Sequence, residues 1–333
     1  MKAFVTGGTG FVGSHLVESL LSNPEVEETK ALVRTQEKWL KGLAYTPVHG
    51  TLEQIDAIGP HLKGIGVLFH CAAILHAPNL ESFIQANVDA TIRLVEMAAE
   101  SGVKNVVILS SLAAVGPSNA DADALTEDST MHPISGYGRS KMMMEQRLRE
   151  HFEQSNSYPN LSIKILRPPA VYGPRETDIF GLFKALNMRI APIIGPFQQE
   201  NLSLIHVKDL VEGICKSIKW TSPGIHTYFV GGEKDAYSWE QIFSTSANIL
   251  GKSYLKIPIP KSLLFTVARF SELTAPLLNR YPPLNVEKAQ ELSQNWVCSS
   301  DKARRDWGYS PSVNLEEGLT KTLGWYKKQG WLS

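Results

Sequence analysis

The chain has 333 residues, which is long enough for two domains or for one domain with a large elaboration. Its 33 basic residues balance 33 acidic ones, so its charge favours neither nucleic acid nor an anionic membrane surface as a partner. Cys71, Cys215 and Cys298 are too widely spaced for a zinc motif or a disulfide framework, and they fit a reducing compartment. No run reaches the ~18 apolar residues of a membrane span, and the first predicted strand leaves no room for a signal peptide. We therefore expect a cytoplasmic protein with no stable membrane insertion.

A glycine-rich segment separates the first predicted strand, residues 2–5, from the first predicted helix. It contains Gly7, Gly10 and Gly13, and apolar residues at helical spacing follow from Leu16 onward. Glycines at this spacing allow a tight turn and close approach of the backbone to a diphosphate. The N–H groups and the dipole at the helix start favour the negative charge. A glycine-rich turn that binds nothing is the alternative, but the flanking strand and helix favour a dinucleotide-binding loop.

Short apolar runs alternate with helical patterns through the first half of the chain. The predicted strands are 2–5, 30–33, 46–50, 67–73, 106–111, 162–167 and 225–230. The main predicted helices after the first are 84–99, 137–152 and 207–219. Near-continuous apolar strands that alternate with helices are typical of a parallel sheet covered on both faces. The pattern therefore predicts an α/β protein with a Rossmann-type doubly wound parallel sheet.

The pattern changes from about Gly173, where prolines cluster and the predicted strands become short. We expect residues 1–173 and 205–231 to form the NAD(P)-binding Rossmann domain. Residues 174–204 and 232–333 are expected to form a smaller mixed C-terminal lobe. Because ligands of doubly wound sheets bind at the carboxyl ends of the strands, this lobe is the expected substrate-binding lobe.

A second signal is the spacing of Tyr137 and Lys141, which lie four residues apart on a predicted helix. Side chains at this spacing project from one helix face. A nearby ammonium favours the phenolate, which lowers the tyrosine pKa from about 10 and prepares the group for proton transfer. The same spacing occurs by chance on exposed helices, so its interpretation depends on a further signal.

The third signal is the serine pair Ser110 and Ser111 at the end of strand 106–111. This position lies at the carboxyl edge of the predicted sheet, where a hydroxyl can hydrogen-bond a substrate carbonyl. Serines at strand ends are often only turn formers. Together with the glycine segment upstream and Tyr137 and Lys141 downstream, however, they predict hydride transfer to or from a nicotinamide, with Tyr137 passing a proton.

The chain resembles an extended short-chain dehydrogenase/reductase, a superfamily that includes the nucleotide-sugar epimerases and dehydratases. The segments that carry the resemblance are 6–13, 70–73, 87–91, 110–111, 137–141, 167–174 and 205–209. The sequence that follows Ser110 is nearer the hydroxysteroid dehydrogenase and dihydroflavonol reductase branch than the nucleotide-sugar enzymes. In that branch the second serine acts, which favours Ser111.

The resemblance implies a role for several residues around the cofactor. Phe11 and Val12 would supply backbone donors to the diphosphate, and Ala72 and Ala73 would line the cofactor cleft. Lys141 would also hold the nicotinamide ribose next to Tyr137.

Two further parts of the site follow from the same resemblance. Pro168 and Val171 would lie beside the nicotinamide. Asn87 resembles a helix asparagine that supports the catalytic site, and an ordinary helix-surface amide is the alternative.

The end of strand 30–33 indicates which nicotinamide binds. An NAD site usually has Asp or Glu there, on the ribose 2′-hydroxyl, whereas this chain has Arg34 with Lys38 following. An arginine can stack on adenine and bind a 2′-phosphate in a bidentate manner. The alternatives are that Arg34 is a solvated surface charge and that Glu37 binds the ribose of NAD. We therefore expect NADP, with NAD as the alternative.

The resemblance also bears on the substrate. Ala170 stands where nucleotide-sugar enzymes have an asparagine that contacts the diphosphate, and residues 201–206 lack their Arg-Asp pair. Each lost partner would cost a diphosphate about 1–3 kcal/mol, although Arg175, Lys184 or Arg189 could compensate. Apolar residues within 180–194 and 263–270 form either the core of the lobe or a pocket for an apolar alcohol or ketone.

These observations predict an NAD(P)-dependent oxidoreductase that interconverts a carbonyl and a hydroxyl on a small, moderately apolar substrate. Tyr137 would be the general acid/base. A nucleotide-sugar epimerase or dehydratase with tightly held NAD(P) is the alternative, and a non-catalytic dinucleotide-sensing module is a third hypothesis. The resemblance further implies a homodimer through a four-helix interface, built from helices 84–99 and 137–152.

Overall fold

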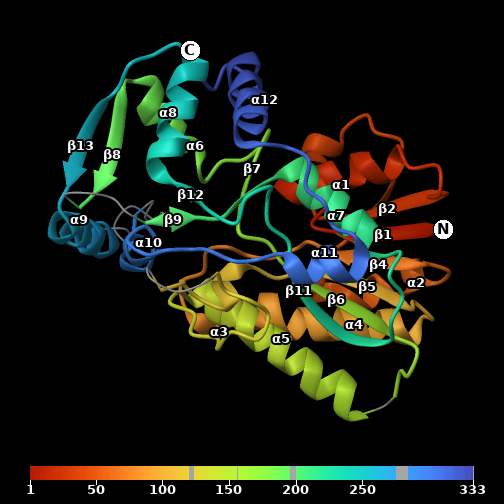
Figure 1. Cartoon of the computed structure of the whole chain (residues 1–333). Helices are drawn as coiled ribbons and strands as arrows, with labels where there is room; N and C mark the ends of the chain where they lie inside the picture. The colour runs from red at the N-terminus through yellow and green to blue at the C-terminus, as the bar shows by residue number, and fades with distance from the viewer. Residues whose placement is uncertain (120–123, 156, 196–199, 275–283, 333) are drawn as a thin grey trace.

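Seven parallel strands form the central sheet, in the order β11-β6-β5-β4-β1-β2-β3 (Figure 1). They are β1 (Lys2–Thr6), β2 (Glu28–Val33), β3 (Thr46–His49), β4 (Val67–His70), β5 (Asn105–Leu109), β6 (Ser162–Arg167) and β11 (Gly224–Phe229). The computed structural model describes residues 1–119, 124–155, 157–195, 200–274 and 284–332. Each predicted strand is present, and the predicted doubly wound Rossmann-type sheet is confirmed.

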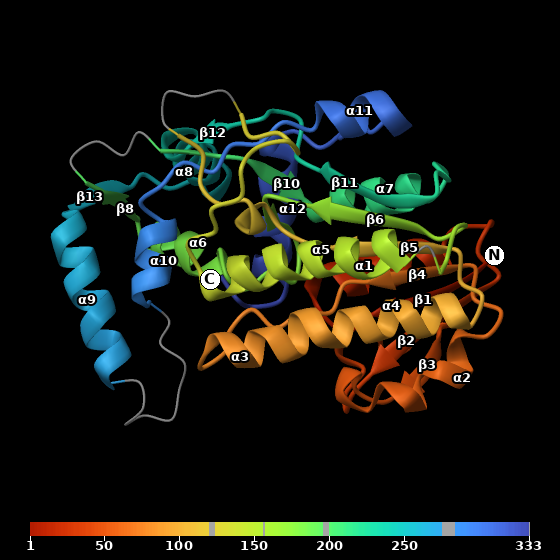
Figure 2. The same cartoon turned by 90° about the horizontal axis from the view of Figure 1, so that it is seen from below.

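Helices cover both faces of this sheet. On one face lie α1 (Phe11–Leu21) and α7 (Val207–Ser217), and on the other lie α4 (Ala90–Glu100) and α5 (Gly136–Ser155) (Figure 2). Alternate side chains of a strand point to opposite faces, so Phe4 packs in the cluster with α4 and α5. Its neighbours Ala3 and Val5 pack with α1 and α7. All three side chains are fully buried, which explains why the strands are apolar on both faces.

Short helices connect the elements at the edge formed by β2 and β3. They are the 3-10 helices η1 (Lys38–Leu40) and η2 (Leu52–Ala57), followed by α2 (Gly59–Leu62). Residues 34–37 separate the end of β2 from η1, so Arg34 and Glu37 precede this helix and Lys38 is its first residue.

The predicted helix 84–99 is not a single α-helix. It consists of α3 (Leu80–Phe83), a π-helical segment η3 (Ile84–Asp89) and α4. Apolar spacing does not distinguish a π-turn from an α-turn, and π-turns are frequent at functional sites. Here the π-helical segment contains Asn87, whose side chain is buried.

The described residues outside the central sheet form three strand pairs and several helices, most of them in the smaller mixed lobe. The pairs are β7 (Ala170–Tyr172) with β10 (Leu204–His206), β8 (Ile190–Ile194) with β13 (Leu255–Ile259), and β9 (Asn201–Leu202) with β12 (Tyr237–Ser238). The helices are α6 (Phe180–Asn187), α8 (Trp239–Leu250), α9 (Lys261–Thr274), α10 (Val286–Glu291) and α12 (Leu315–Lys328). Its core is aromatic, with Tyr172, Phe183, Phe243 and Tyr326 in one buried cluster.

One C-terminal helix packs on the sheet instead of the lobe. Helix α11 (Asp301–Trp307) lies along β11 (Figure 1), and Ala303 and Tyr309 belong to the buried cluster that also contains β1. Among the described residues, no helix is both long and apolar enough to cross a membrane.

Candidate active site

The glycine segment between β1 and α1 has the geometry of a diphosphate cradle. Gly7 has a φ of 72°, and a Cβ there would lie 2.6 Å from the backbone nitrogen of Ala72. A Cβ on Gly13 would lie 2.1 Å from the carbonyl oxygen of Gly7. Helix α1 begins at Phe11, and no side chain of the described residues caps its N-terminus at Gly10. The first N–H groups of the helix therefore keep their donors for a ligand, which fits the diphosphate of a dinucleotide.

The strand order brings the other predicted segments to the same carboxyl edge of the sheet. The backbone N–H of Cys71, just after β4, donates to the carbonyl of Thr6 at 3.1 Å, which places Ala72 beside the glycine segment. The N–H of Leu112, just after β5, donates to the carbonyl of Pro168 at 2.9 Å. The segments after β1, β4, β5 and β6 thus lie next to one another, as the predicted cofactor cleft requires.

On the same edge, Ala72 is half-buried and Ala73 is exposed. Pro168 is buried directly after β6, and Val171 is half-buried in β7, where it pairs with Ile205.

Ser111 and Tyr137 meet because a glycine allows two elements to approach closely. Ser111 precedes the short helix η4 (Leu112–Ala114), and its Oγ accepts from the N–H of Ala113 at 3.1 Å. A Cβ on Gly138, next to Tyr137, would lie 2.3 Å from the carbonyl oxygen of Ala113. The hydroxyl proton of Ser111 remains available, and its interaction with the phenol lowers the pKa of Tyr137. Sequence reasoning missed Gly138, although it lies inside the segment 137–141.

The phenol of Tyr137 is held in its neutral form. Burial raises the pKa of Tyr137, and the hydrogen bond with Ser111 lowers it by less. The carboxylates of Glu291 and Asp178 raise it further. The Nζ of Lys141 lies 6.0 Å from the centre of the Tyr137 ring. In this structure burial outweighs the effects that lower the pKa of Tyr137.

Lys141 lies one helical turn after Tyr137, on the side of α5 that faces the sheet. Its side chain is 2% exposed, and its Nζ donates to the carbonyl of Leu109 at 2.7 Å. Burial lowers the pKa of Lys141 to about 8, against the opposing effect of Glu145. The ammonium is therefore still the main form at pH 7.

The two strand-end serines have different partners. The hydroxyl of Ser110 donates to Oε1 of Glu145 at 2.5 Å, so Ser110 points into the protein. Glu145 also binds Arg167 at the end of β6, with 2.6 Å between Nη2 and Oε2. Of the two serines, Ser111 is the one that affects the pKa of Tyr137.

Asn87 is buried and joins the segment after β4 to α5. It is 1% exposed, which rules out a helix-surface amide. Its Oδ1 accepts from the N–H of Ile74 at 2.9 Å, and its Nδ2 donates to the carbonyl of Ile74 and to Oγ of Ser140, each at 3.0 Å. Asn87 therefore fixes the cleft segment relative to the helix that carries Tyr137.

A buried histidine extends this network to the glycine segment. Nδ1 of His70 lies 2.7 Å from Oγ1 of Thr6, and Nε2 lies 2.9 Å from Oγ1 of Thr91. Because Thr91 donates its own proton to the carbonyl of Asn87, Nε2 of His70 must donate and Nδ1 must accept. Burial lowers the pKa of His70 to about 3, so this chain of hydrogen bonds carries no charge.

The residues expected at the 2′-side of the cofactor lie after β2. Arg34 and Lys38 are exposed, and Lys38 has a φ of 49°. Oε1 of Glu37 accepts from the hydroxyl of Tyr45 at 3.0 Å. The candidate ribose ligand for NAD therefore already has one hydrogen-bond partner, and the two basic side chains face solvent.

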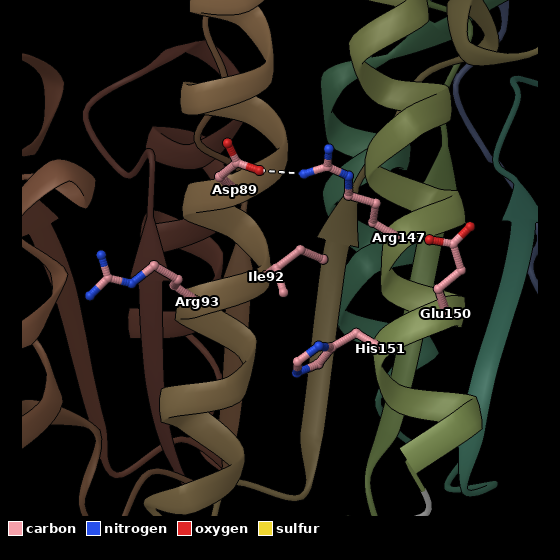
Figure 3. Close-up of a pocket in the computed structure, with 6 residues that line it drawn as sticks. All are labelled: Asp89, Ile92, Arg93, Arg147, Glu150 and His151. Atoms are coloured by element: carbon pink, nitrogen blue, oxygen red, sulfur yellow. Dashed lines mark hydrogen bonds and ion pairs between the residues drawn. The ribbon is translucent and has the colours of Figure 1, made fainter.

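A separate cavity of about 470 Å³ lies between α4 and α5 (Figure 3). It is lined by charged and polar side chains and one apolar one, namely Asp89, Ile92, Arg93, Arg147, Glu150 and His151. None of these belongs to the strand ends described above, so this cavity is not part of the candidate active site.

Comparison with known proteins agrees with this geometry. Residues 3–231 match the family described as the NAD dependent epimerase/dehydratase family. The chain is 29% identical over 332 residues to ceramide reductase of Caulobacter vibrioides, covering 98% of this chain and 95% of that protein. It is 26% identical over 329 residues to the decarboxylating sterol-4-alpha-carboxylate 3-dehydrogenase of Dictyostelium discoideum, covering 96% and 98%. The crystal structure of gox2253 is similar over 99% of each chain, with a TM-score of 0.80 and 27% identity.

Proposed function

Because the chain belongs to the NAD dependent epimerase/dehydratase family, within the extended short-chain dehydrogenases/reductases, we propose that it is an NADP-dependent oxidoreductase. It interconverts a carbonyl and a hydroxyl on a small, moderately apolar substrate. The observation that carries this proposal is the close approach of the segments of Ser111 and Tyr137 at the carboxyl edge, with Lys141 buried below and the glycine cradle alongside.

Each of these side chains has a distinct role in the proposed reaction. The bound cofactor supplies or accepts the hydride. In the direction of reduction, the neutral phenol of Tyr137 donates its proton to the substrate oxygen, and Ser111 hydrogen-bonds the same oxygen. The ammonium of Lys141 stabilises the phenolate that remains and holds the nicotinamide ribose. Asn87 keeps the cleft segment and α5 in place.

The proposal of NADP rests on charge at the end of β2. The exposed Arg34 and Lys38 suit a 2′-phosphate, and the carboxylate of Glu37 is held by Tyr45. A carboxylate facing the ribose would favour NAD instead, but Glu37 has another partner here.

Two observations support an apolar substrate over a nucleotide sugar. Arg175, which could have bound a diphosphate, donates to Ser14 at 2.9 Å and to Glu18 at 2.5 Å on α1. Arg189 donates to Ser253 at 3.3 Å. The two relatives described above are named for ceramide and a sterol carboxylate, which are apolar molecules.

The apolar residues predicted for the lobe divide into two sets. Those of 180–194 are largely core, because Phe183, Leu186 and Ile194 are at most 7% exposed. In α9, by contrast, Val267 is 48% exposed and Phe270 is 68% exposed. We propose that residues 174–204 and 232–333 supply the substrate contacts.

The test of this proposal is Tyr137→Phe, assayed by oxidation of NADPH with a panel of ketones and aldehydes. We expect kcat to fall by about 10²–10⁴-fold because the proton donor is lost. Tyr254→Phe is the matched control, since the hydroxyl of Tyr254 bonds Glu240 on the lobe surface, and it should leave kcat unchanged. Full turnover by Tyr137→Phe would contradict the assignment.

We also propose that two copies of the chain associate through α4 and α5. The face between these helices carries both signs of charge, including an ion pair of 2.6 Å between Arg147 and Asp89 (Figure 3). A two-fold axis through such a face would bring basic groups of one copy to acidic groups of the other.

A further inference from the structure

A buried carboxylate lies one helical turn beyond the proposed catalytic lysine. Glu145 and Lys141 occupy positions i+4 and i of α5, on the face that packs against the sheet. Both side chains are 2% exposed. The proposed mechanism gives Glu145 no role, and a buried carboxylate without a function is costly.

Hydrogen-bond donors surround the carboxylate of Glu145. Its carboxylate accepts from the hydroxyl of Ser110 at 2.5 Å, and from Nε and Nη2 of Arg167 at 3.0 and 2.6 Å. Hydrogen bonds and an opposite charge offset the cost of burying a carboxylate. Ser110 directly follows β5, and Arg167 is the last residue of β6. Their hydrogen bonds therefore also fix the carboxylate of Glu145 relative to the carboxyl edge of the sheet.

The other titratable groups that act on Lys141 carry no negative charge. His70 is neutral because burial lowers its pKa to about 3. Cys71 remains a thiol because burial raises its pKa to about 12. Tyr137, on the same helix, is a neutral phenol. Glu145 is therefore the anion that opposes the effect of burial on Lys141.

In the part of the chain that the structure describes, little negative charge other than that of Glu145 is available to the buried cation Arg167. Arg167 is 4% exposed, and its Nη1 has no hydrogen-bond partner among the described residues. Glu127 also interacts with Arg167, but burial raises the pKa of Glu127. Because Glu145 binds Arg167 and also opposes the effect of burial on Lys141, loss of its charge would remove this compensation from both buried cations.

We propose that Glu145 is a positioning residue whose carboxylate keeps Lys141 protonated at neutral pH, and so allows Lys141 to stabilise the Tyr137 phenolate. This inference rests on the proposed function of Lys141. Activity that needs the ammonium is present below the pKa of Lys141 and is lost as the pH rises through it. Removing the negative partner lowers that pKa, so the loss moves to lower pH.

The experiment compares pH profiles of kcat/KM for the unsubstituted protein, Glu145→Gln and Glu145→Asp. In Glu145→Gln the alkaline loss should begin about one pH unit or more below that of the unsubstituted protein. Glu145→Asp, which keeps the charge, should restore the original profile. A loss of activity in Glu145→Gln that is equal at every pH would overturn the proposal, since it would indicate a structural role only.

The matched control is Glu153→Gln. Glu153 also lies on α5 and also pairs with an arginine, with 3.1 Å between its Oε1 and Nη1 of Arg149, but this pair is on the protein surface. The pH profile of Glu153→Gln should not change. An equal shift in Glu153→Gln would also overturn the proposal, because it would mean that any change of charge on α5 moves the profile.

A second measurement does not depend on turnover or on the folding of Glu145→Gln. The Nζ of Lys141 is titrated by ¹⁵N NMR in the unsubstituted protein and in Glu145→Asp, with Lys141→Met identifying the signal. We expect an ammonium at pH 7 in both proteins, and an amine at pH 7 in either would overturn the proposal. If instead Tyr137→Phe kept full turnover while the ammonium was present, the proposed function would fail and the pairing of Glu145 with Lys141 would stand.

Discussion

The absence of a Cβ on two glycines, Gly13 and Gly138, allows the elements of this site to approach one another closely. A Cβ on Gly13 would overlap the Gly7 carbonyl, and a Cβ on Gly138 would overlap the Ala113 carbonyl. The first glycine lets α1 begin close to β1, and the second brings Tyr137 to Ser111. Spacing predicted the first from the sequence, but Gly138 had no comparable pattern, because its reason is a contact with an element far away in the chain.

The charge of Arg34 makes a testable prediction about cofactor choice. We expect Arg34→Ala to raise the Kd for NADP by about 10–100-fold, because a charged hydrogen bond to the 2′-phosphate is lost. The Kd for NAD, which lacks that phosphate, should change much less. Both constants are measured by titration calorimetry, with Arg305→Ala on the exposed surface of α11 as the control. Equal weakening of both cofactors would count against the assignment of NADP.

Strands were the most predictable elements because burial on both faces makes them continuously apolar. Helix α5 was predictable for a related reason, since Met144 and Leu148 mark its buried side. The π-helical segment η3 was not predictable, because apolar spacing is the same for both kinds of turn and the deciding contacts of Asn87 are with Ile74 and Ser140.

The same helix contained a signal that sequence reasoning did not use. Tyr137, Lys141 and Glu145 are each four residues apart, so all three project toward one side of α5. A carboxylate at the third position is unusual on a buried face, which here also carries Met144 and Leu148. Its partners Ser110 and Arg167 end two other strands, however, and only the sheet order shows that they converge on it.

The arrangement of the whole molecule leaves the α4 and α5 face open for a second copy (Figure 2). If this face is the dimer interface, Arg147→Glu should raise the dimer dissociation constant by about tenfold or more, because it replaces a basic group of the interface by an acidic one and removes its attraction for acidic groups of the other copy. Sedimentation equilibrium measures the change, with Arg305→Glu on α11 as the control. A monomeric unsubstituted protein, or an unaffected dimer in Arg147→Glu, would exclude this interface.

We propose that the segments after β1, β4, β5 and β6 together form a site in which hydride passes between NADP and a carbonyl substrate. The most direct measurement uses NADPH labelled with deuterium at either face of nicotinamide C4, together with a panel of apolar ketones, and mass spectrometry of the products. We predict that one of the two labelled cofactors places deuterium on the new carbinol carbon, with one NADP formed for each product molecule. The account is contradicted if neither label reaches any ketone while a nucleotide sugar is converted without net oxidation of NADPH.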